Sequence, residues 1–254
     1  MKKVVIIYGL LCVAISIFAQ ENNPNLHYVT VKDDGSVEHR DGMIHYNNDE
    51  FKEAFSFFEK SAAKGNGSGM FMLGSMFNKG KGVTQDYAKA MEWYLKAAES
   101  NHESAMFNIA VMYMNGNGVT QNTETAMTWA EKAANHGHVQ SMLNLATRAF
   151  EKFDYSTAYK WLLKAAEAGD VNGMSNLGVL YMNGMGTRQD VNAAYQWWLK
   201  AAEEGEVLST YFIATMYDDG KIENGTKEDT IAWYKKAADL GHQRAAERLK
   251  ELIK

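Results

Sequence analysis

The feature that most constrains this chain is a repeat of about 36 residues. The triplet Lys-Ala-Ala starts at Lys96, Lys132, Lys164, Lys200 and Lys236, so successive copies lie 36, 32, 36 and 36 residues apart. A tryptophan stands three residues before each of these lysines, and Phe57 and Lys60 extend the series upstream. A period of this length indicates stacked supersecondary units, which need no single central core. We therefore expect five full units and one degenerate leading unit.

Each unit is predicted to be a helical hairpin. In the second half of the unit, Ala90, Trp93, Tyr94 and Ala97 have the i, i+3, i+4, i+7 spacing of a buried helical stripe. A short polar residue that can cap the first turn precedes this segment in every copy: Asp86, Asn122, Asp154, Asp190 and Thr226. In the first half, a small residue would let neighbouring helices approach closely: Gly74, Ala110, Ala146, Gly178 and Ala214.

Two segments depart from the regular unit. Glycine loops such as Gly80-Lys81-Gly82 join the two helices elsewhere, but the third unit lacks this loop between Arg148 and Tyr155. We interpret this gap as a tight turn between helices of ordinary length and not as a domain boundary. The last segment, 242–254, starts like a first helix but places Lys250 at the small-residue position, which is typical of a capping helix.

The whole pattern, Leu-Gly, then Tyr, a Gly-x-Gly loop, Asp, Trp-Tyr and Lys-Ala-Ala-x-x-Gly, resembles the Sel-1-like repeat, a relative of the tetratricopeptide repeat. The resemblance extends from about Phe51 to Lys254. It implies an all-α fold, a right-handed α/α superhelix of about five full repeats with a degenerate N-terminal repeat and a C-terminal capping helix. We assign residues 43–254 to this domain and residues 20–42 to a linker, a small cap or a small hairpin. The family also implies a scaffold for other proteins.

The N-terminus has the order of a secretory leader. Lys2 and Lys3 precede an apolar run from Val4 to Phe18, and we expect cleavage after Ala19. The alternative is an uncleaved anchor, although this run is short for a bilayer span. Residues 1–19 are thus predicted to be a signal peptide of an exported, periplasmic or secreted bacterial protein, with no stable membrane insertion after cleavage. The single cysteine, Cys12, lies in the leader, so the mature chain would have no thiol chemistry.

The charge balance argues against nucleic acid as a partner. Without the leader lysines the chain has 24 basic and 31 acidic residues, and it contains no basic run. Such a chain repels phosphate backbones. The expected partner is therefore a protein or a peptide.

A candidate binding surface follows from the same resemblance, because first helices line the concave side of the tetratricopeptide fold. The position before the repeated Leu or Ile is asparagine in three units, Asn108, Asn144 and Asn176, and a carboxamide can pair with the backbone of an extended peptide. The alternatives are solvated asparagines or hydrogen bonds between helices. Further candidates near these positions are Ser68, Ser104, Gln140, Asn172, Phe71, Phe107 and Tyr211. For Phe71 and Phe107, packing between repeats is favoured over an apolar pocket.

The hypothesis of an enzymatic function has less support. Ser61-Ala62-Ala63-Lys64 matches the Ser-x-x-Lys motif of penicillin-recognising enzymes, which suggests activity on β-lactams or peptidoglycan as an alternative function. The rest of that signature is missing, and the cysteine pairs of the repeat proteins linked to penicillin binding are missing too. Ser61 takes an alanine position of the repeat, so we predict a buried helical serine, no catalytic residues and no cofactor. A secreted factor that engages host proteins is a further alternative.

Two other residue classes have structural interpretations. At helical spacing the repeated tryptophans are predicted to be core and not a ligand-stacking surface. Histidines and carboxylates in the turns could suggest a metal site, but they recur one repeat apart, too far for a single zinc shell. We predict polar turns and no metal at His102, His136, His138, Asp170, Glu206 and His242.

Overall fold

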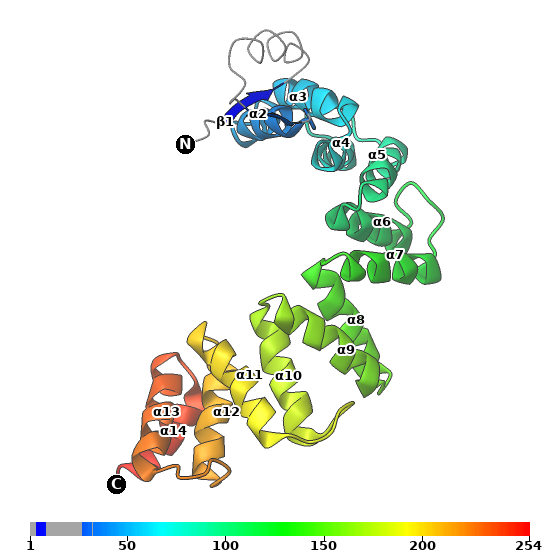
Figure 1. The fold of residues 1–254 in the computed structure, drawn as a ribbon. Coiled ribbons are helices and arrows are strands. Elements are labelled where there is room, and N and C mark those ends of the chain that lie inside the picture. Colours follow the sequence, from blue (N-terminus) through cyan, green and yellow to red (C-terminus); the bar gives the residue numbers. More distant parts are fainter. Residues whose placement is uncertain (1–3, 9–26, 32) are drawn as a thin grey trace. The chain divides into compact units, whose positions relative to one another are not determined.

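The structure is a computed structural model that describes residues 4–8, 27–31 and 33–254. Thirteen helices make up most of the described chain, which divides into two compact units, 1–136 and 137–254 (Figure 1). The strands β1 (Val4–Tyr8) and β2 (His27–Val31) form a parallel pair in which Val4 lies opposite His27. Among the helices described here, none has the length and apolar character that a bilayer crossing requires.

Both units consist of helices that pack as consecutive hairpins (Figure 1). The first unit contains α2 (Ser36–Asn47), α3 (Phe51–Ala63), α4 (Gly67–Lys79), α5 (Tyr87–Glu99), α6 (Glu103–Asn115) and α7 (Thr123–Asn135). The second unit contains α8 (Val139–Glu151), α9 (Tyr155–Glu167), α10 (Val171–Asn183), α11 (Val191–Glu203), α12 (Val207–Asp218), α13 (Lys227–Asp239) and α14 (Gln243–Leu252). The all-α repeat fold predicted from the sequence is confirmed.

Side-chain caps fix where the helices begin. All five predicted caps of the second helices accept a backbone N–H of the first turn, as Asp86 does from Lys89 at 3.0 Å. The first helices have caps of their own: Asn66, His102, His138, Asp170, Glu206 and His242. All of these except Asn66 belong to the histidines and carboxylates that the sequence offers as metal ligands. They cap helices instead, so the prediction of polar turns is confirmed for these five. Each cap satisfies a donor that the first helical turn leaves unpaired.

The small residues of the first helices allow close approach of an aromatic ring. A Cβ at Gly74 would lie 2.6 Å from the Tyr94 ring, and one at Gly178 would lie 2.3 Å from Nε1 of Trp198. The Trp198 indole N–H donates to the Ser175 carbonyl at 2.9 Å, so the ring is held by a hydrogen bond as well as by packing. The predicted role of these positions is therefore confirmed.

The repeated tryptophans are only partly core. Trp161 is buried at 3% exposure, but Trp93, Trp129, Trp197 and Trp233 are half-buried. The lysine of the triplet covers their open faces, with Nζ at 4.1 Å from the ring centroid for Lys132 over Trp129 and at 4.2 Å for Lys200 over Trp197. A lysine stem can shield an apolar face while its ammonium group stays in water. The fully core position is one residue later, at Tyr94, Leu162, Trp198 and Tyr234.

The N-terminal region differs from the expected linker. The boundary predicted between residues 42 and 43 falls inside α2, which has almost no apolar periodicity and is held by its packing on α3. Gly42 is buried there, and a Cβ would lie 2.6 Å from the Phe58 ring. The strand at 27–31 pairs in parallel with β1, whereas a hairpin would need an antiparallel partner. Cys12 and the predicted cleavage point after Ala19 lie outside the described residues.

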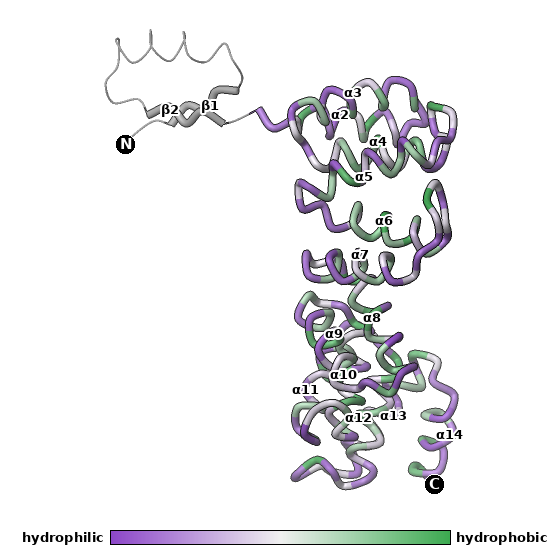
Figure 2. The backbone as a smooth tube through the Cα atoms, turned by 90° about the vertical axis from the view of Figure 1, so that its right-hand side faces the viewer, coloured by the Kyte–Doolittle hydropathy of each residue, from purple (hydrophilic) through white to green (hydrophobic). Residues whose placement is uncertain are grey.

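The two irregular segments fold as the sequence predicts. Helices α8 and α9 both have 13 residues and are joined by a three-residue turn inside the second unit. The division between the units comes earlier, after residue 136. At the C-terminus, α14 buries Ala245, leaves Lys250 exposed and is mainly hydrophilic along its length (Figure 2). Arg248 fixes it to α12 through two hydrogen bonds to the Asp218 carboxylate, at 2.8 and 3.1 Å.

Candidate partner-binding surface

Four positions on each first helix lie along one side at the spacing i, i+4, i+7 and i+11. We call this side the first-helix stripe. The sequence predicted the first two of these positions but not the last two, at which no residue type recurs in more than two units. Its members are Ser68, Met72, Ser75 and Lys79 on α4; Ser104, Asn108, Val111 and Asn115 on α6; Gln140, Asn144, Thr147 and Glu151 on α8; Asn172, Asn176, Val179 and Asn183 on α10; and Leu208, Phe212, Thr215 and Asp219 on or beside α12.

The stripe is open to solvent on α8 and α10. All four members on α8 are exposed, and on α10 only Val179 is half-buried. The Gln140 side chain donates to Oδ1 of Asn144 at 2.9 Å. This hydrogen bond orients the Asn144 carboxamide and leaves the NH2 group of Asn144 for a ligand. Asn176 makes no side-chain hydrogen bond within the described chain. Both asparagines therefore present donors on the surface of the second unit.

Asn108 lies in a different environment, in the first unit. It is half-buried and approaches the Tyr94 hydroxyl, which comes from α5. Burial raises the pKa of Tyr94 to about 12, and the side chains of Asn108 and Ser75 partly oppose that shift. The contacts fall outside normal hydrogen-bond geometry among the described residues. Asn108 is thus better explained as a contact between helices than as a donor that is open to a ligand.

The predicted site residues are divided between the two units. Asn144, Asn176, Gln140, Asn172 and Tyr211 belong to the second unit, and Ser68, Ser104, Phe71, Phe107 and Asn108 belong to the first. Ser68 and Ser104 are half-buried, whereas Gln140 and Asn172 are exposed. The second unit therefore collects the open polar candidates.

The aromatic candidates pack between repeats. Phe71 stacks on His102 of the next first helix, with ring centroids 4.6 Å apart and planes 14° apart. Tyr211 stacks in the same way on His242, at 4.0 Å and 19°. Phe107 is half-buried against the apolar cluster of α5 and α6. Burial also lowers the pKa of His102, which favours the neutral ring that accepts the Ala105 amide in its cap.

An apolar hollow lies elsewhere on the stripe, among α10, α11 and α12. Its volume is about 180 Å³, and Val179, Met182, Trp198 and Phe212 line its apolar part. The Phe212 ring packs on Trp198 with a centroid distance of 4.8 Å. The only signal for it in the sequence was that Phe212 replaces asparagine at the stripe position. The hollow borders the stripe at Val179, one helical turn after Asn176.

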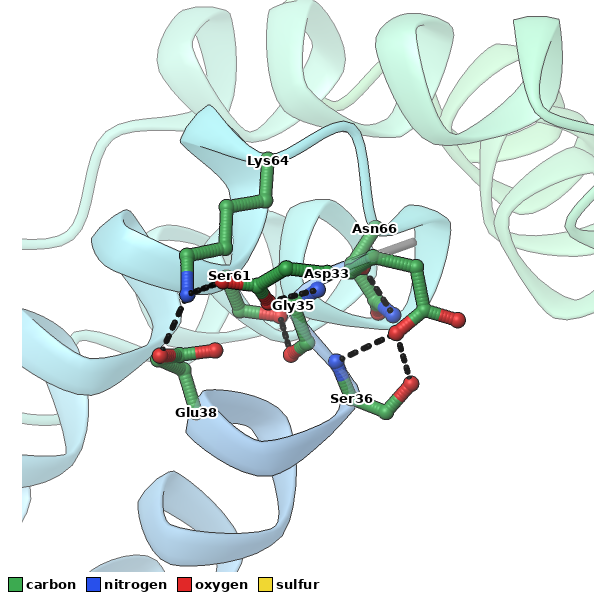
Figure 3. Close-up of polar contacts among 8 residues, drawn as sticks. Asp33, Gly35, Ser36, Glu38, Ser61, Lys64 and Asn66 are labelled. Carbon is green, nitrogen blue, oxygen red and sulfur yellow. Dashed lines mark hydrogen bonds and ion pairs between the residues drawn. The ribbon is translucent and has the colours of Figure 1, made fainter. Parts of the chain in front are cut away.

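The Ser-x-x-Lys motif has a structural role (Figure 3). Ser61 is fully buried, and its hydroxyl donates to the Gly35 carbonyl at 2.7 Å. The Lys64 ammonium group contacts Asp33 and Glu38, at 2.6 Å each. These pairs, which raise the pKa of Lys64 through its hydrogen bonds to Asp33 and then Glu38, tie the start of α2 to the end of α3. Ser61 is a buried helical serine, as predicted.

The remaining polar candidates make protein contacts. His136 contacts the Lys132 carbonyl at 2.9 Å and Oδ1 of Asn101 at 3.1 Å. Within the described ranges, no three His, Cys, Asp or Glu side chains gather as metal ligands would. In the second unit, the exposed polar stripe of α8 and α10 and the apolar hollow beside it form the candidate surface.

Stacked helical hairpins with repeated caps and packing pairs define an α-helical repeat protein of the solenoid class. The family model of the Sel1 repeat matches residues 46–66, 67–102, 103–138, 141–170, 171–206 and 207–242. The chain belongs to the Sel1 repeat family. The six matches, the first of them short, confirm the five full units and the degenerate leading unit expected from the sequence.

Solved structures agree with this assignment. A Sel1 repeat protein from Oxalobacter formigenes is 32% identical with a TM-score of 0.62, and the match covers 84% of this chain and 89% of that one. A protective antigen of uropathogenic Escherichia coli with an SLR fold is 28% identical with a TM-score of 0.69; the match covers 85% of this chain but 48% of the antigen. None of the curated proteins compared matches the chain. Sel1 repeat proteins are commonly scaffolds for protein interactions and typically not enzymes.

Proposed function

We propose that this protein is an exported, non-enzymatic scaffold that binds an extended segment of a partner protein along the stripe of α8, α10 and α12. The observation that carries the proposal is the pair of exposed carboxamides, Asn144 and Asn176, at equivalent positions of consecutive repeats in one unit. The hollow at Phe212 lies on the same side of that unit.

The chemistry of the surface suits a peptide backbone. A carboxamide offers two donors and one acceptor, so it can pair with the N–H and C=O groups that an extended segment leaves unpaired. The hollow has the size of one apolar side chain, whose burial would contribute about 1.5–3 kcal/mol. The polar positions would then fix the register of the segment, and the hollow would select one of its side chains.

Export rests on the leader sequence, with Lys2 and Lys3 before the apolar run and Ala19 at its end. If the proposal is correct, the protein purified from the periplasm or the medium will begin at Gln20. Intact-mass measurement on fractionated cells tests this. Full-length protein confined to the cytoplasm would contradict export but would leave the binding proposal standing.

The binding proposal is tested by replacing Asn144 and Asn176 with alanine in one variant. We expect loss of the partner in affinity capture followed by mass spectrometry, with unchanged helix content by circular dichroism. Asn108→Ala is the matched control, because Asn108 is half-buried in the other unit and should keep the partner. Retained capture by the double variant would rule out this surface.

A further inference from the structure

The turn between α8 and α9 has the backbone of the turns between repeats. In this turn the amides of Phe153 and Asp154 donate to the carbonyls of Phe150 and Ala149, each at 2.9 Å. In the turn between α9 and α10, Gly169 and Asp170 make the equivalent bonds at 3.0 and 2.9 Å. Each turn therefore has one residue in the left-handed region, directly before the N-cap of the next helix.

The residue in that left-handed position is unusual only in the α8–α9 turn. Glycine takes the position in five turns, at Gly65, Gly137, Gly169, Gly205 and Gly241, and Asp49 and Asn101 take it in two others. These three residue types tolerate the conformation best. Phe153 adopts it at φ 58°. A bulky side chain there lowers the ratio of folded to unfolded protein by roughly 5- to 30-fold relative to glycine.

The Phe153 side chain recovers little of this cost inside the chain. It is 77% exposed, more than any other large apolar side chain in the described residues. Its ring makes a T-shaped contact with the ring of Tyr155, at 6.4 Å between centroids. A conformation that disfavours folding is thus combined with an aromatic ring that stays in water, and such outliers are typical of functional positions.

We propose that Phe153 is an anchor residue that inserts into an apolar pocket of a partner protein, and that basic side chains surround that pocket. The charges beside Phe153 support this choice of partner. Glu151 and Asp154 are exposed and outnumber Lys152, and the cap bonds from Thr157 keep the pKa of Asp154 below its ordinary value. This acidic surround complements lysine or arginine side chains and repels an anionic membrane surface.

The contact is distinct from the asparagine pair of the proposed function. Phe153 follows Glu151, the last stripe position on α8, but its anchoring role requires neither Asn144 nor Asn176. The two proposals can therefore fail separately, since the Asn144 and Asn176 double variant should retain a contact made by Phe153.

The strain is tested with Phe153→Gly in the full chain. We expect a higher urea midpoint and a folded-to-unfolded ratio raised about 5-fold or more, because glycine adopts the left-handed conformation at little cost. Phe153→Leu keeps a bulky side chain and should not gain this stability. An unchanged or lower midpoint for the glycine variant would overturn the proposal, since the phenylalanine would then stabilise the fold.

The contact is tested by placing the photocrosslinking analogue p-benzoylphenylalanine at position 153 in producing cells. We expect a crosslinked protein that the same analogue at Leu240, an exposed residue before the Gly241 turn, does not give. That protein, once purified, should bind Phe153→Gly at least 10-fold more weakly than the parent chain, and Glu151→Lys should also weaken binding. Equal affinity for the parent and the glycine variant, crosslinks only to lipid or to a second copy of the chain, or no crosslink at all would each overturn the proposal.

Discussion

The hairpins α8–α9 and α10–α11 are neighbours in one unit and match consecutive Sel1 repeats, yet they differ in their connecting loops and in their interior side chains. Both contain two helices of 13 residues, and an aspartate caps the second helix of each. One is joined by a three-residue turn, and the other by a loop with Gly184 and Gly186 at positive φ. Caps and interior packing therefore determine the hairpin, whereas the length of the connection does not.

Their interiors differ by a matched exchange. At the equivalent repeat positions the first hairpin has Ala146 and Leu162, and the second has Gly178 in close approach to Trp198; all four residues are buried. A larger ring on the second helix is thus accompanied by the loss of a Cβ on the first. This reciprocity is expected where side chains are close-packed.

The largest effect should come from breaking that reciprocity. Gly178→Ala places a Cβ where Nε1 of Trp198 would be 2.3 Å away, so we expect a loss of about 1–3 kcal/mol in urea unfolding. Adding Trp198→Leu reproduces the pair of the first hairpin and should cost less than the sum of the two single changes. Additive losses would show that the two positions do not constrain each other.

A somewhat smaller effect is expected at the turn that follows α9. Gly169 has positive φ, and no atom lies within 4 Å of a Cβ built on it, so Gly169→Ala tests backbone conformation without a steric clash. We expect a loss of about 1–2 kcal/mol in urea unfolding. Gly169→Asn should lose less, because Asn101 occupies the equivalent position elsewhere. Equal losses for both variants would argue against a conformational origin.

The N-caps of the first helices also differ between the two hairpins. Asp170 accepts the Gly173 amide at 2.7 Å, and His138 accepts the Ser141 amide at 3.2 Å. We expect Asp170→Ala to cost about 1 kcal/mol, since its charge also favours the helix N-terminus. His138→Ala should cost less. A larger loss for the histidine variant in the same urea titration would reverse the predicted order.

The smallest expected effect concerns the lysines over tryptophan. The Lys200 Nζ lies 4.2 Å from the ring centroid of the half-buried Trp197. We therefore expect Lys200→Met to lower the free energy of unfolding by about 0.5–1 kcal/mol. Lys164 lies 5.0 Å from the buried Trp161, which Lys160 also contacts, and Lys164→Met should cost less. Thermal unfolding of both variants measures the difference. Equal midpoints for parent and both variants would show that the pairs contribute no stability.

The sequence predicted what depends on periodicity. Repeat number, caps, the small residues at Gly74 and Gly178 and the tight turn at Phe153 all follow from residues that recur at fixed offsets. It did not distinguish Trp197 from Trp198, because a broad apolar stripe includes both adjacent positions and only the neighbouring helices decide which is buried. Helix α2 was missed because its packing on α3, and not its own pattern, holds it.

For the site, the sequence predicted the residue positions but not their environments. Asn108, Asn144 and Asn176 are equivalent in the repeat, yet only Asn108 approaches a tyrosine hydroxyl from another helix. The hollow at Phe212 combines side chains from three helices and has no local motif. Such differences arise from tertiary contacts, which a repeat alignment averages out.

The proposed binding of a partner segment along the stripe of α8, α10 and α12 should protect the backbone of these helices. Hydrogen–deuterium exchange of the protein, alone and with the partner recovered by affinity capture, measures this protection. We expect slower exchange on binding in Val139–Glu151 and Val171–Asn183, the helices of the two exposed asparagines. Slower exchange confined to the second helices α9 and α11, with α8 and α10 unchanged, would contradict it.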